Sequence, residues 1–244
     1  MTTFTAAPDR VGSFKSRLLK VCGATTRADV ELLANAGADL VGLWHGVPDG
    51  PAERSVEQVA ALAEAARSTG ILEPMLVTFL SDVDILRQIV ERTGIQWIQL
   101  HAYQMPGMVR GLRSAVPDEL TIVKVLHLKR GKCLERPLIK AYEQAGTDVF
   151  LLDVVTDDGQ IGSTGQRLQA SDVVGLVPSF SKPFLLAGGI SAHNSGDYQA
   201  VVEHPQFHGI DVDTGARDRS GRFEGRNITE ISRGWRTARY EEVA

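Results

Sequence analysis

Residues 18–45 read LLKVCGATTRADVELLANAGADLVGLWH and contain the pattern that decides the fold. Two apolar runs, LLKVCG at 18–23 and DLVGLWH at 39–45, flank a helix-like segment at 26–36. Each run is apolar almost throughout, which is typical of parallel strands that are covered on both faces. The stretch therefore predicts a strand–helix–strand unit of a parallel sheet.

The same alternation recurs along the rest of the chain. Further strands are expected at PMLVTFL (74–80), WIQLH (97–101), IVKVLHL (122–128), VFLLDVV (149–155), PFLLAGG (183–189) and GIDVDTG (209–215). Further helices are expected at 55–68, 82–94, 106–116, 137–145, 170–177, 192–203 and 227–238. Eight such units in roughly 230 residues predict an α/β protein, a single-domain (β/α)8 TIM barrel at 17–244. A doubly wound open sheet is the alternative, but such sheets usually have fewer strands. Residues 1–16 are expected to form a flexible N-terminal extension.

Composition excludes several classes of function. The 244 residues are 43% hydrophobic and carry a formal net charge of −4, which gives no general attraction to nucleic acid or to anionic membranes. The apolar runs are too short to span a bilayer. Two cysteines do not make a disulfide scaffold, so a cytoplasmic protein is expected. The sequence leaves both a monomer and a homodimer open.

A TIM barrel carries its active site at the carboxyl ends of its strands. The residues at or just beyond the expected strand ends are Cys22, His45, His101, His127, Asp153, Gly188, Gly189 and 213–215. The three histidines show neither HxH nor HExxH spacing, so no metal site is expected. Cys133, in the loop after the fifth strand, is expected to be an incidental exposed thiol.

Several of these strand ends carry motifs that occur together in one family. KVCGATTRAD (20–29), IQLH (98–101), FLLD (150–153), FLLAGGISAHN (184–194) and GIDVDTGARDRSGRFEGRNITEI (209–231) follow one another along the chain. As an ordered set they resemble the motifs of phosphoribosylanthranilate isomerases. The resemblance implies a cofactor-independent isomerase of tryptophan biosynthesis, which performs an Amadori rearrangement on a small phosphosugar.

The resemblance also implies roles for individual residues. Cys22 corresponds to the general base and Asp153 to the general acid, and such chemistry needs one of each. Arg54, Gln99 and His101 correspond to substrate-binding positions. Phosphate is expected on the backbone of the glycine-bearing loops after strands six, seven and eight. The residues concerned are Gly162, Gly165, Gly188, Gly189, Thr214 and Gly215.

Three loops depart from the family pattern. WHGVPDGPAERS (44–55) is longer than the family's Pro-x-Ser-x-Arg loop, and 166–169 replace a Phe-Asp-Trp run. Asp213 stands where the family has serine, with Arg217 nearby to offset its charge or to grip the phosphate. These departures leave two alternatives open. One is a paralogue in specialised metabolism that acts as an isomerase or lyase on a related substrate, and the other is a non-catalytic ligand-binding barrel.

Overall fold

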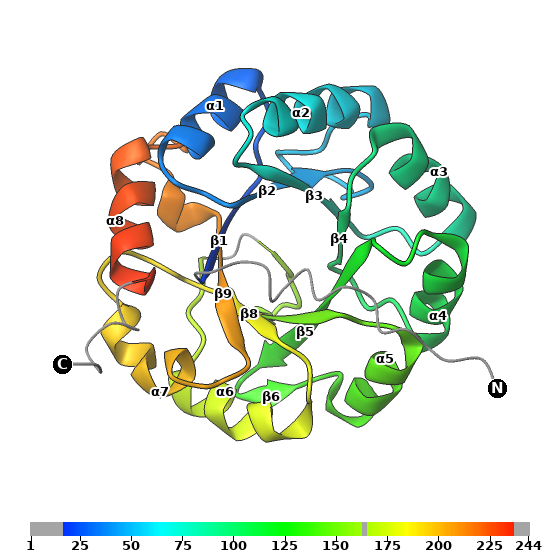
Figure 1. The fold of residues 1–244 in the computed structure, drawn as a ribbon. Helices are drawn as coiled ribbons and strands as arrows, with labels where there is room; N and C mark the ends of the chain where they lie inside the picture. The colour runs from blue at the N-terminus through cyan, green and yellow to red at the C-terminus, as the bar shows by residue number, and fades with distance from the viewer. Residues whose placement is uncertain (1–16, 163–164, 237–244) are drawn as a thin grey trace.

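Eight parallel strands close into a barrel in the computed structural model, which describes residues 17–162 and 165–236 (Figure 1). The strands are β1 Leu18–Cys22, β2 Leu40–Trp44, β3 Glu73–Thr78, β4 Trp97–Leu100, β5 Thr121–Lys129, β7 Val149–Val154, β8 Phe184–Leu186 and β9 Phe207–Val212. Pairing runs in chain order, and the contacts of β1 with β9 and of β4 with β5 complete the ring. The expectation of a (β/α)8 barrel is confirmed.

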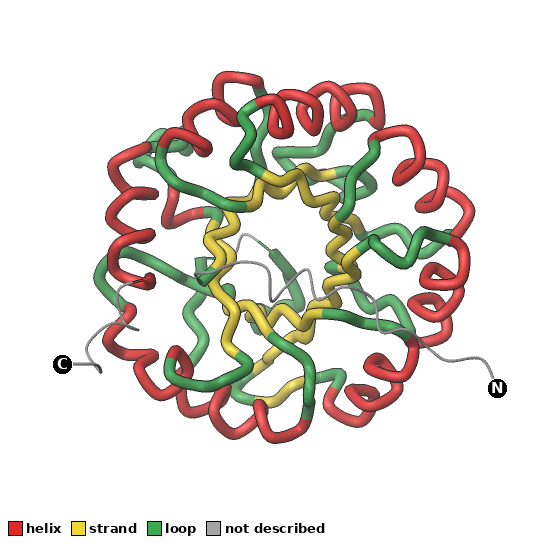
Figure 2. The backbone as a smooth tube through the Cα atoms, in the orientation of Figure 1, coloured by secondary structure: helices red, strands yellow, loops and turns green. Residues whose placement is uncertain are grey.

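The helices form an outer ring around the strands (Figure 2). They are α1 Arg27–Asn35, α2 Val56–Ser68, α3 Val83–Thr93, α4 Pro106–Ala115, α5 Ile139–Ala145, α6 Ala170–Leu176, α7 Gln199–Val202 and α8 Gly225–Arg236. Single 3-10 turns lie at η1 Arg136–Leu138, η2 Val177–Ser179, η3 Ser195–Tyr198 and η4 Thr214–Ala216. Local chemistry explains several boundaries. Ser55 caps the N-terminus of α2, and Gly94 ends α3 in the left-handed conformation.

Two elements differ from the sequence prediction. A continuous helix was expected at 192–203, but this segment contains η3 and the four-residue α7. Asn194 holds the chain in a turn beforehand, because its side chain accepts from the N–H of Ser191 and donates to the carbonyl of Gly189. The second difference is β6, Lys132–Cys133, which pairs antiparallel with β5 where a loop was expected.

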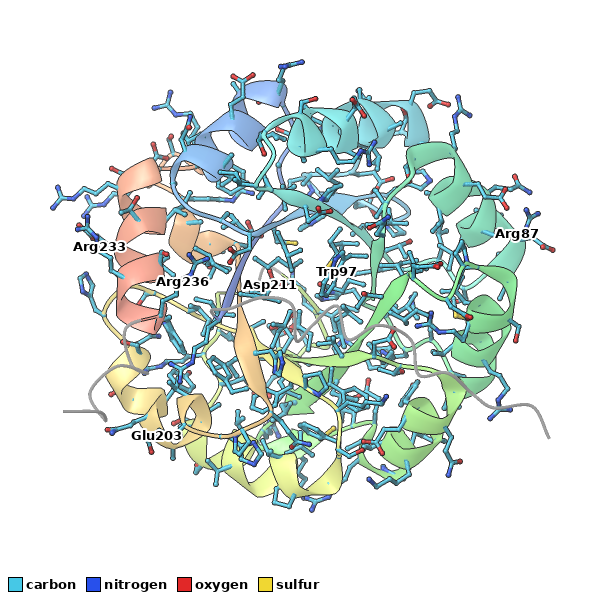
Figure 3. All side chains as sticks on the ribbon, in the orientation of Figure 1. Arg87, Trp97, Glu203, Asp211, Arg233 and Arg236 are labelled. Carbon is cyan, nitrogen blue, oxygen red and sulfur yellow. The ribbon has the colours of Figure 1, made fainter. Side chains whose placement is uncertain are left out.

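Alternating side chains of each strand divide the core into two parts. The inward residues form a small apolar plug inside the barrel, which includes Leu18, Met75, Trp97 and Leu151. The outward residues pack beneath the helices in one large cluster. Figure 3 shows Trp97 and Asp211 inside the ring of strands, whereas Arg87 and Arg233 lie on the outer surface. Because side chains alternate with a period of two, inward residues beyond the plug face the barrel mouth.

Candidate active site

A cavity of about 430 Å³ occupies the barrel mouth at the carboxyl ends of the strands. It is lined by Cys22, Trp44, 47–51, Val77, Phe79, His101, Asp153, 159–162, Gly165, 187–190 and 211–215. These residues come from every parallel strand except β5, or from the loop that follows it. The location agrees with the general rule for barrel enzymes.

Cys22 is the last residue of β1, and its thiol lies at the floor of this cavity. The Nζ of Lys20 lies 3.3 Å from Sγ, and the indole Nε1–H of Trp44 donates to the same sulfur at 3.1 Å. Gly42 leaves the space for this group, because a Cβ there would lie 2.6 Å from Sγ. Burial raises the pKa of the Cys22 thiol to about 12, while Lys20 and Trp44 act in the opposite direction by stabilising the thiolate.

Lys20 and Asp211 form an ion pair inside the barrel, with Nζ 2.7 Å from Oδ2. Lys20 is fully buried, and burial disfavours its charge, but the attraction of Asp211 and Cys22 prevails and raises its pKa. The ammonium therefore stays charged directly beside the thiol. Lys20 and Cys22 are two residues apart on β1, so the spacing alone places them on one side of the strand. The spacing does not reveal Asp211, because that residue lies 191 positions away on β9.

Asp153 projects from β7 into the same cavity, as the resemblance implied. Its side chain is almost completely buried, and burial raises its pKa to about 6. The N–H of Val154 donates to Oδ1 and opposes that shift. A carboxyl group in this setting is protonated over part of the range near neutrality, which suits a general acid.

His101 faces Asp153, with Nε2 3.5 Å from Oδ2. Burial, together with the charges of neighbouring groups, lowers the pKa of His101 well below its usual value, so the ring is neutral. Gln99 does not line the cavity; it lies beneath His101 and contacts Nδ1 at 2.7 Å. Of these two expected substrate-binding residues, the structure therefore brings His101 to the cavity and places Gln99 behind it.

The glycine-bearing loops after β7, β8 and β9 converge on the same cavity. Gly162, Gly165, Gly188, Gly189, Thr214 and Gly215 all line the cavity. Gly188 and Gly189 have φ values of 83° and 62°, a conformation that glycine adopts without strain. Within the described residues, the backbone N–H groups of Gly188, Gly189 and Gly215 have no hydrogen-bond acceptor. Such N–H groups suit a phosphate. Ser163 and Thr164, which stand between Gly162 and Gly165 in the sequence, lie outside the described residues. The predicted extension at 1–16 also lies outside them.

Asp213 is paired with Arg217, whose Nε lies 2.7 Å from Oδ1. The guanidinium also donates to the carbonyls of Cys22 and Gly23, and it lies over the ring of Phe223. Arg217 therefore offsets the charge of Asp213, one of the two roles considered from the sequence. It also ties the end of β1 to the loop after β9.

Arg54 does not line the cavity. Its Nη1 donates to the carbonyl of Glu53 at 2.6 Å, and its Nε donates to the carbonyl of Thr25 at 3.3 Å. From the same loop, Val47 lines the cavity, and it packs with Ala52, Cys22 and Trp44 in an apolar cluster. Arg54 was expected to bind substrate, but its guanidinium is hydrogen-bonded to backbone carbonyls outside the cavity lining.

The remaining candidates have structural partners. His127 is buried and pairs with Glu135 at 2.6 Å from Nδ1, while Nε2 contacts the carbonyl of His101 at 3.0 Å. The Nδ1 of His45 contacts the carbonyl of Arg54 at 2.8 Å.

In residues 17–162 and 165–236, no group of three or more His, Cys, Asp or Glu side chains is arranged to hold a metal. Cys133 is half-buried, not exposed as expected, because it packs against the large core cluster, and burial raises its pKa to about 11.

Comparison with known proteins identifies the family. The model of the family described as N-(5'-phosphoribosyl)anthranilate (PRA) isomerase matches residues 19–230. The chain belongs to this family. An isomerase named N-(5'-phosphoribosyl)anthranilate isomerase 2 from Methanosarcina mazei is 28% identical over 83% of the chain and 87% of its own length. The PRA isomerase of Natronomonas pharaonis is 30% identical over 83% of the chain and 90% of its own length.

Solved PRA isomerases share the fold. The Thermus thermophilus enzyme has a TM-score of 0.71 and 19% identity, over 89% of this chain and 97% of its own. The Thermococcus kodakaraensis enzyme has a TM-score of 0.70 and 22% identity, over 91% and 99%. A further PRA isomerase, solved with reduced 1-(o-carboxyphenylamino)-1-deoxyribulose 5-phosphate, has a TM-score of 0.68 and 18% identity, over 89% and 98%. No helix in the described part of the chain has the length and apolar character needed to cross a membrane.

Proposed function

We propose that this protein catalyses the Amadori rearrangement of N-(5'-phosphoribosyl)anthranilate, with Cys22 as general base and Asp153 as general acid. The observation that carries the proposal is that these two side chains line one cavity from β1 and β7. The glycine-bearing loops that suit a phosphate line the same cavity. Family membership supports the reaction type.

Asp153 opens the sugar ring. Its carboxylic acid donates a proton to the furanose ring oxygen, the C1'–O4' bond breaks, and the nitrogen lone pair forms a C1'=N bond. The product is a protonated Schiff base. Because its pKa is about 6, a fraction of Asp153 stays protonated near neutral pH. An ordinary aspartate, with a pKa of about 3.9, would be almost fully ionised there. Neutral His101, 3.5 Å from the carboxyl, adds no positive charge that would favour ionisation of the acid.

Cys22 then removes the C2' proton. The electrons of the C2'–H bond form a C1'=C2' double bond, and the iminium electrons return to nitrogen. The resulting enolamine tautomerises to the ketose when C1' gains a proton and the C2' hydroxyl loses one. Lys20 and Trp44 both contact Sγ and stabilise the thiolate that this step requires. The positive charge of the iminium intermediate also favours the thiolate, and it is present at the step in which Cys22 removes the proton.

The phosphate binds to the loops after β7, β8 and β9. The N–H groups of Gly188, Gly189 and Gly215 offer hydrogen bonds, and the hydroxyl of Thr214 lies on the same cavity wall. Each of these groups is a neutral donor, so the phosphate is bound by oriented dipoles. This arrangement suits a protein whose net charge of −4 provides no long-range attraction.

The direct test is the loss of phosphoribosylanthranilate fluorescence on addition of purified protein. Cys22→Ala and Asp153→Asn are each expected to reduce turnover by at least about a thousandfold, since each removes one proton-transfer group. Cys133→Ser is the matched control for loss of a thiol, and it should retain wild-type turnover. Wild-type turnover in either active-site variant contradicts the assigned roles.

The proposal also covers the cellular location and the assembly state of the enzyme. A cytoplasmic location and a monomeric or homodimeric state are in keeping with a small-molecule phosphosugar substrate. One related structure is described as a monomeric form of a dimeric PRA isomerase from Thermotoga maritima. Sedimentation of the purified full chain would distinguish the two assembly states.

A further inference from the structure

His127 lies beside Asp153 inside the barrel, and the mechanism derived so far does not use it. The two residues are register partners on the neighbouring strands β5 and β7. Both side chains point inward, because the preceding inward pair on these strands, Val125 and Leu151, belongs to the apolar plug. Neighbouring strands lie about 4.8 Å apart, so register partners that face the same way are adjacent. His127 is fully buried and does not line the cavity, so it is adjacent to the acid without touching substrate.

Both ring nitrogens of His127 contact hydrogen-bond acceptors. Nδ1 lies 2.6 Å from Oε1 of Glu135, and Nε2 lies 3.0 Å from the carbonyl oxygen of His101. Burial opposes the charge of Glu135, but its hydrogen bonds with His127 prevail and lower its pKa, so it is a carboxylate. A carboxylate and a carbonyl only accept, and each ring nitrogen must therefore carry a hydrogen. The contacts make His127 an imidazolium.

The other ionisable groups near this pair do not replace it. Besides His101 and Asp153, they are Tyr103, Lys124, Cys133 and Tyr142. Burial raises the pKa values of the two tyrosines and the cysteine, so these groups are neutral near pH 7. Lys124 is a second buried cation, but it lies on the other face of β5, with its Nζ over the ring of Tyr142 in α5.

Asp153 becomes a buried carboxylate when it gives its proton to the sugar ring oxygen. Burial disfavours that charge, and Asp211 adds a like charge, whereas His127 and Lys20 favour it. Lys20 is paired with Asp211, so the two largely offset each other. Glu135 belongs to the loop after β5, so His127 is the member of its own pair that adjoins Asp153. A fixed cation at this place stabilises the developing carboxylate without reorganisation during the reaction.

We propose that His127, held as an imidazolium by Glu135, is a positioning residue that stabilises the carboxylate which Asp153 becomes after donating its proton. The proposal rests on the isomerase function proposed above and adds a charged pair that supports its acid. It predicts a measurable charge state for His127 and a measurable influence on Asp153.

The charge state is measured on the wild-type full chain without substrate. In ¹⁵N-labelled protein, the ring nitrogens of His127 are assigned by their absence in His127→Gln. Both nitrogens should show the chemical shifts of a protonated imidazolium at pH 7. A neutral ring at pH 7 would overturn the proposal, and this result decides the matter even where a variant fails to fold.

The influence on Asp153 is measured by titrating its ¹³C carboxyl resonance, which is assigned with Asp153→Asn. The double variant His127→Gln/Glu135→Gln removes both charges and keeps groups that form hydrogen bonds. Its Asp153 pKa should be higher than in wild type by about 0.3 pH units or more, because the adjoining cation is lost. Lys124→Gln, which removes a cation from the other face of β5, is the matched control. A smaller increase in the double variant, or an equal increase in the control, contradicts the proposal.

These two measurements are independent of turnover. A wild-type protein that does not consume phosphoribosylanthranilate would refute the isomerase function, whatever the charge of His127. A neutral His127 in an active enzyme would refute only the role assigned to this pair.

Discussion

The indole Nε1–H of Trp44 donates to Sγ of Cys22 at 3.1 Å, across the boundary between β2 and β1. A hydrogen bond to an ionised acceptor contributes about 1.5–3 kcal/mol. This bond favours the thiolate over the thiol, so Trp44 supports the form of Cys22 that removes a proton. Lys20 reaches the same sulfur from within β1.

Replacing Trp44 should therefore make Cys22 less reactive. In a Cys133→Ser background, Trp44→Phe keeps an aromatic side chain in the apolar cluster around Cys22 and removes the N–H donor. Loss of the bond raises the thiol pKa by about one to two units, and thiolate reactivity at a fixed pH falls about tenfold per unit. The iodoacetamide alkylation rate at pH 8 measures this fall. Trp97→Phe, in the apolar plug, controls for general loss of a tryptophan. An unchanged alkylation rate would exclude the hydrogen bond as a thiolate-stabilising contact.

Space beside Cys22 depends on Gly42. An alanine Cβ at this position would lie 2.6 Å from Sγ and 3.3 Å from the Nζ of Lys20. Gly42→Ala should displace the thiol while β2 still forms, and kcat/KM should fall by about a hundredfold. The matched control is Gly175→Ala in α6, where a Cβ meets no other atom within 4 Å. Wild-type kcat/KM in Gly42→Ala would show that the thiol position is not critical.

The buried pair of Lys20 and Asp211 is expected to behave as a unit. Lys20→Met leaves an uncompensated buried carboxylate and should cost about 3–5 kcal/mol of unfolding free energy. The double variant Lys20→Met/Asp211→Leu removes both charges, so it should be more stable than the two single losses added together. Urea unfolding of all four proteins completes the cycle. Strict additivity would mean that the two charges do not interact.

Burial of Asp153 should make stability depend on pH. Its pKa is about 6 in the folded protein, against about 3.9 in an unfolded chain. Between these values the folded state retains a proton that the unfolded state releases, so the unfolding free energy decreases as pH rises from about 4 to 6. A shift of about two units corresponds to roughly 3 kcal/mol.

Asp153→Asn removes this titration. The stability of the variant relative to wild type should therefore increase as pH rises from 4 to 7, with the change concentrated below pH 6. Urea unfolding at four pH values in that range measures the difference. Asp118→Asn, at an exposed loop position, is the control and should show no such trend. A difference that stays constant with pH would show that the Asp153 pKa is not raised.

The site was only partly predictable from the sequence. Cys22, Asp153 and the glycine-bearing loops were identified because each lies at a strand end within a recognisable motif, and all of them line the cavity. Arg54 was expected to bind substrate only from the resemblance, in a loop that departs from the family pattern, and its side chain donates to backbone carbonyls. Its direction depends on how the extra residues of the β2–α2 loop fold, and residue type does not encode that path.

The fold itself was determined by local pattern. Eight apolar runs of strand length, separated by amphipathic segments, leave few arrangements other than a closed parallel barrel, since every strand must be covered on both faces. The alternation within each strand likewise determined that Lys20 and Cys22 face the same way. Tertiary structure alone decided which distant groups meet them: Asp211 on β9 beside Lys20, and Trp44 on β2 above Sγ. Such contacts depend on the register between strands of a closed ring, and a strand's own sequence contains no information about the side chain opposite.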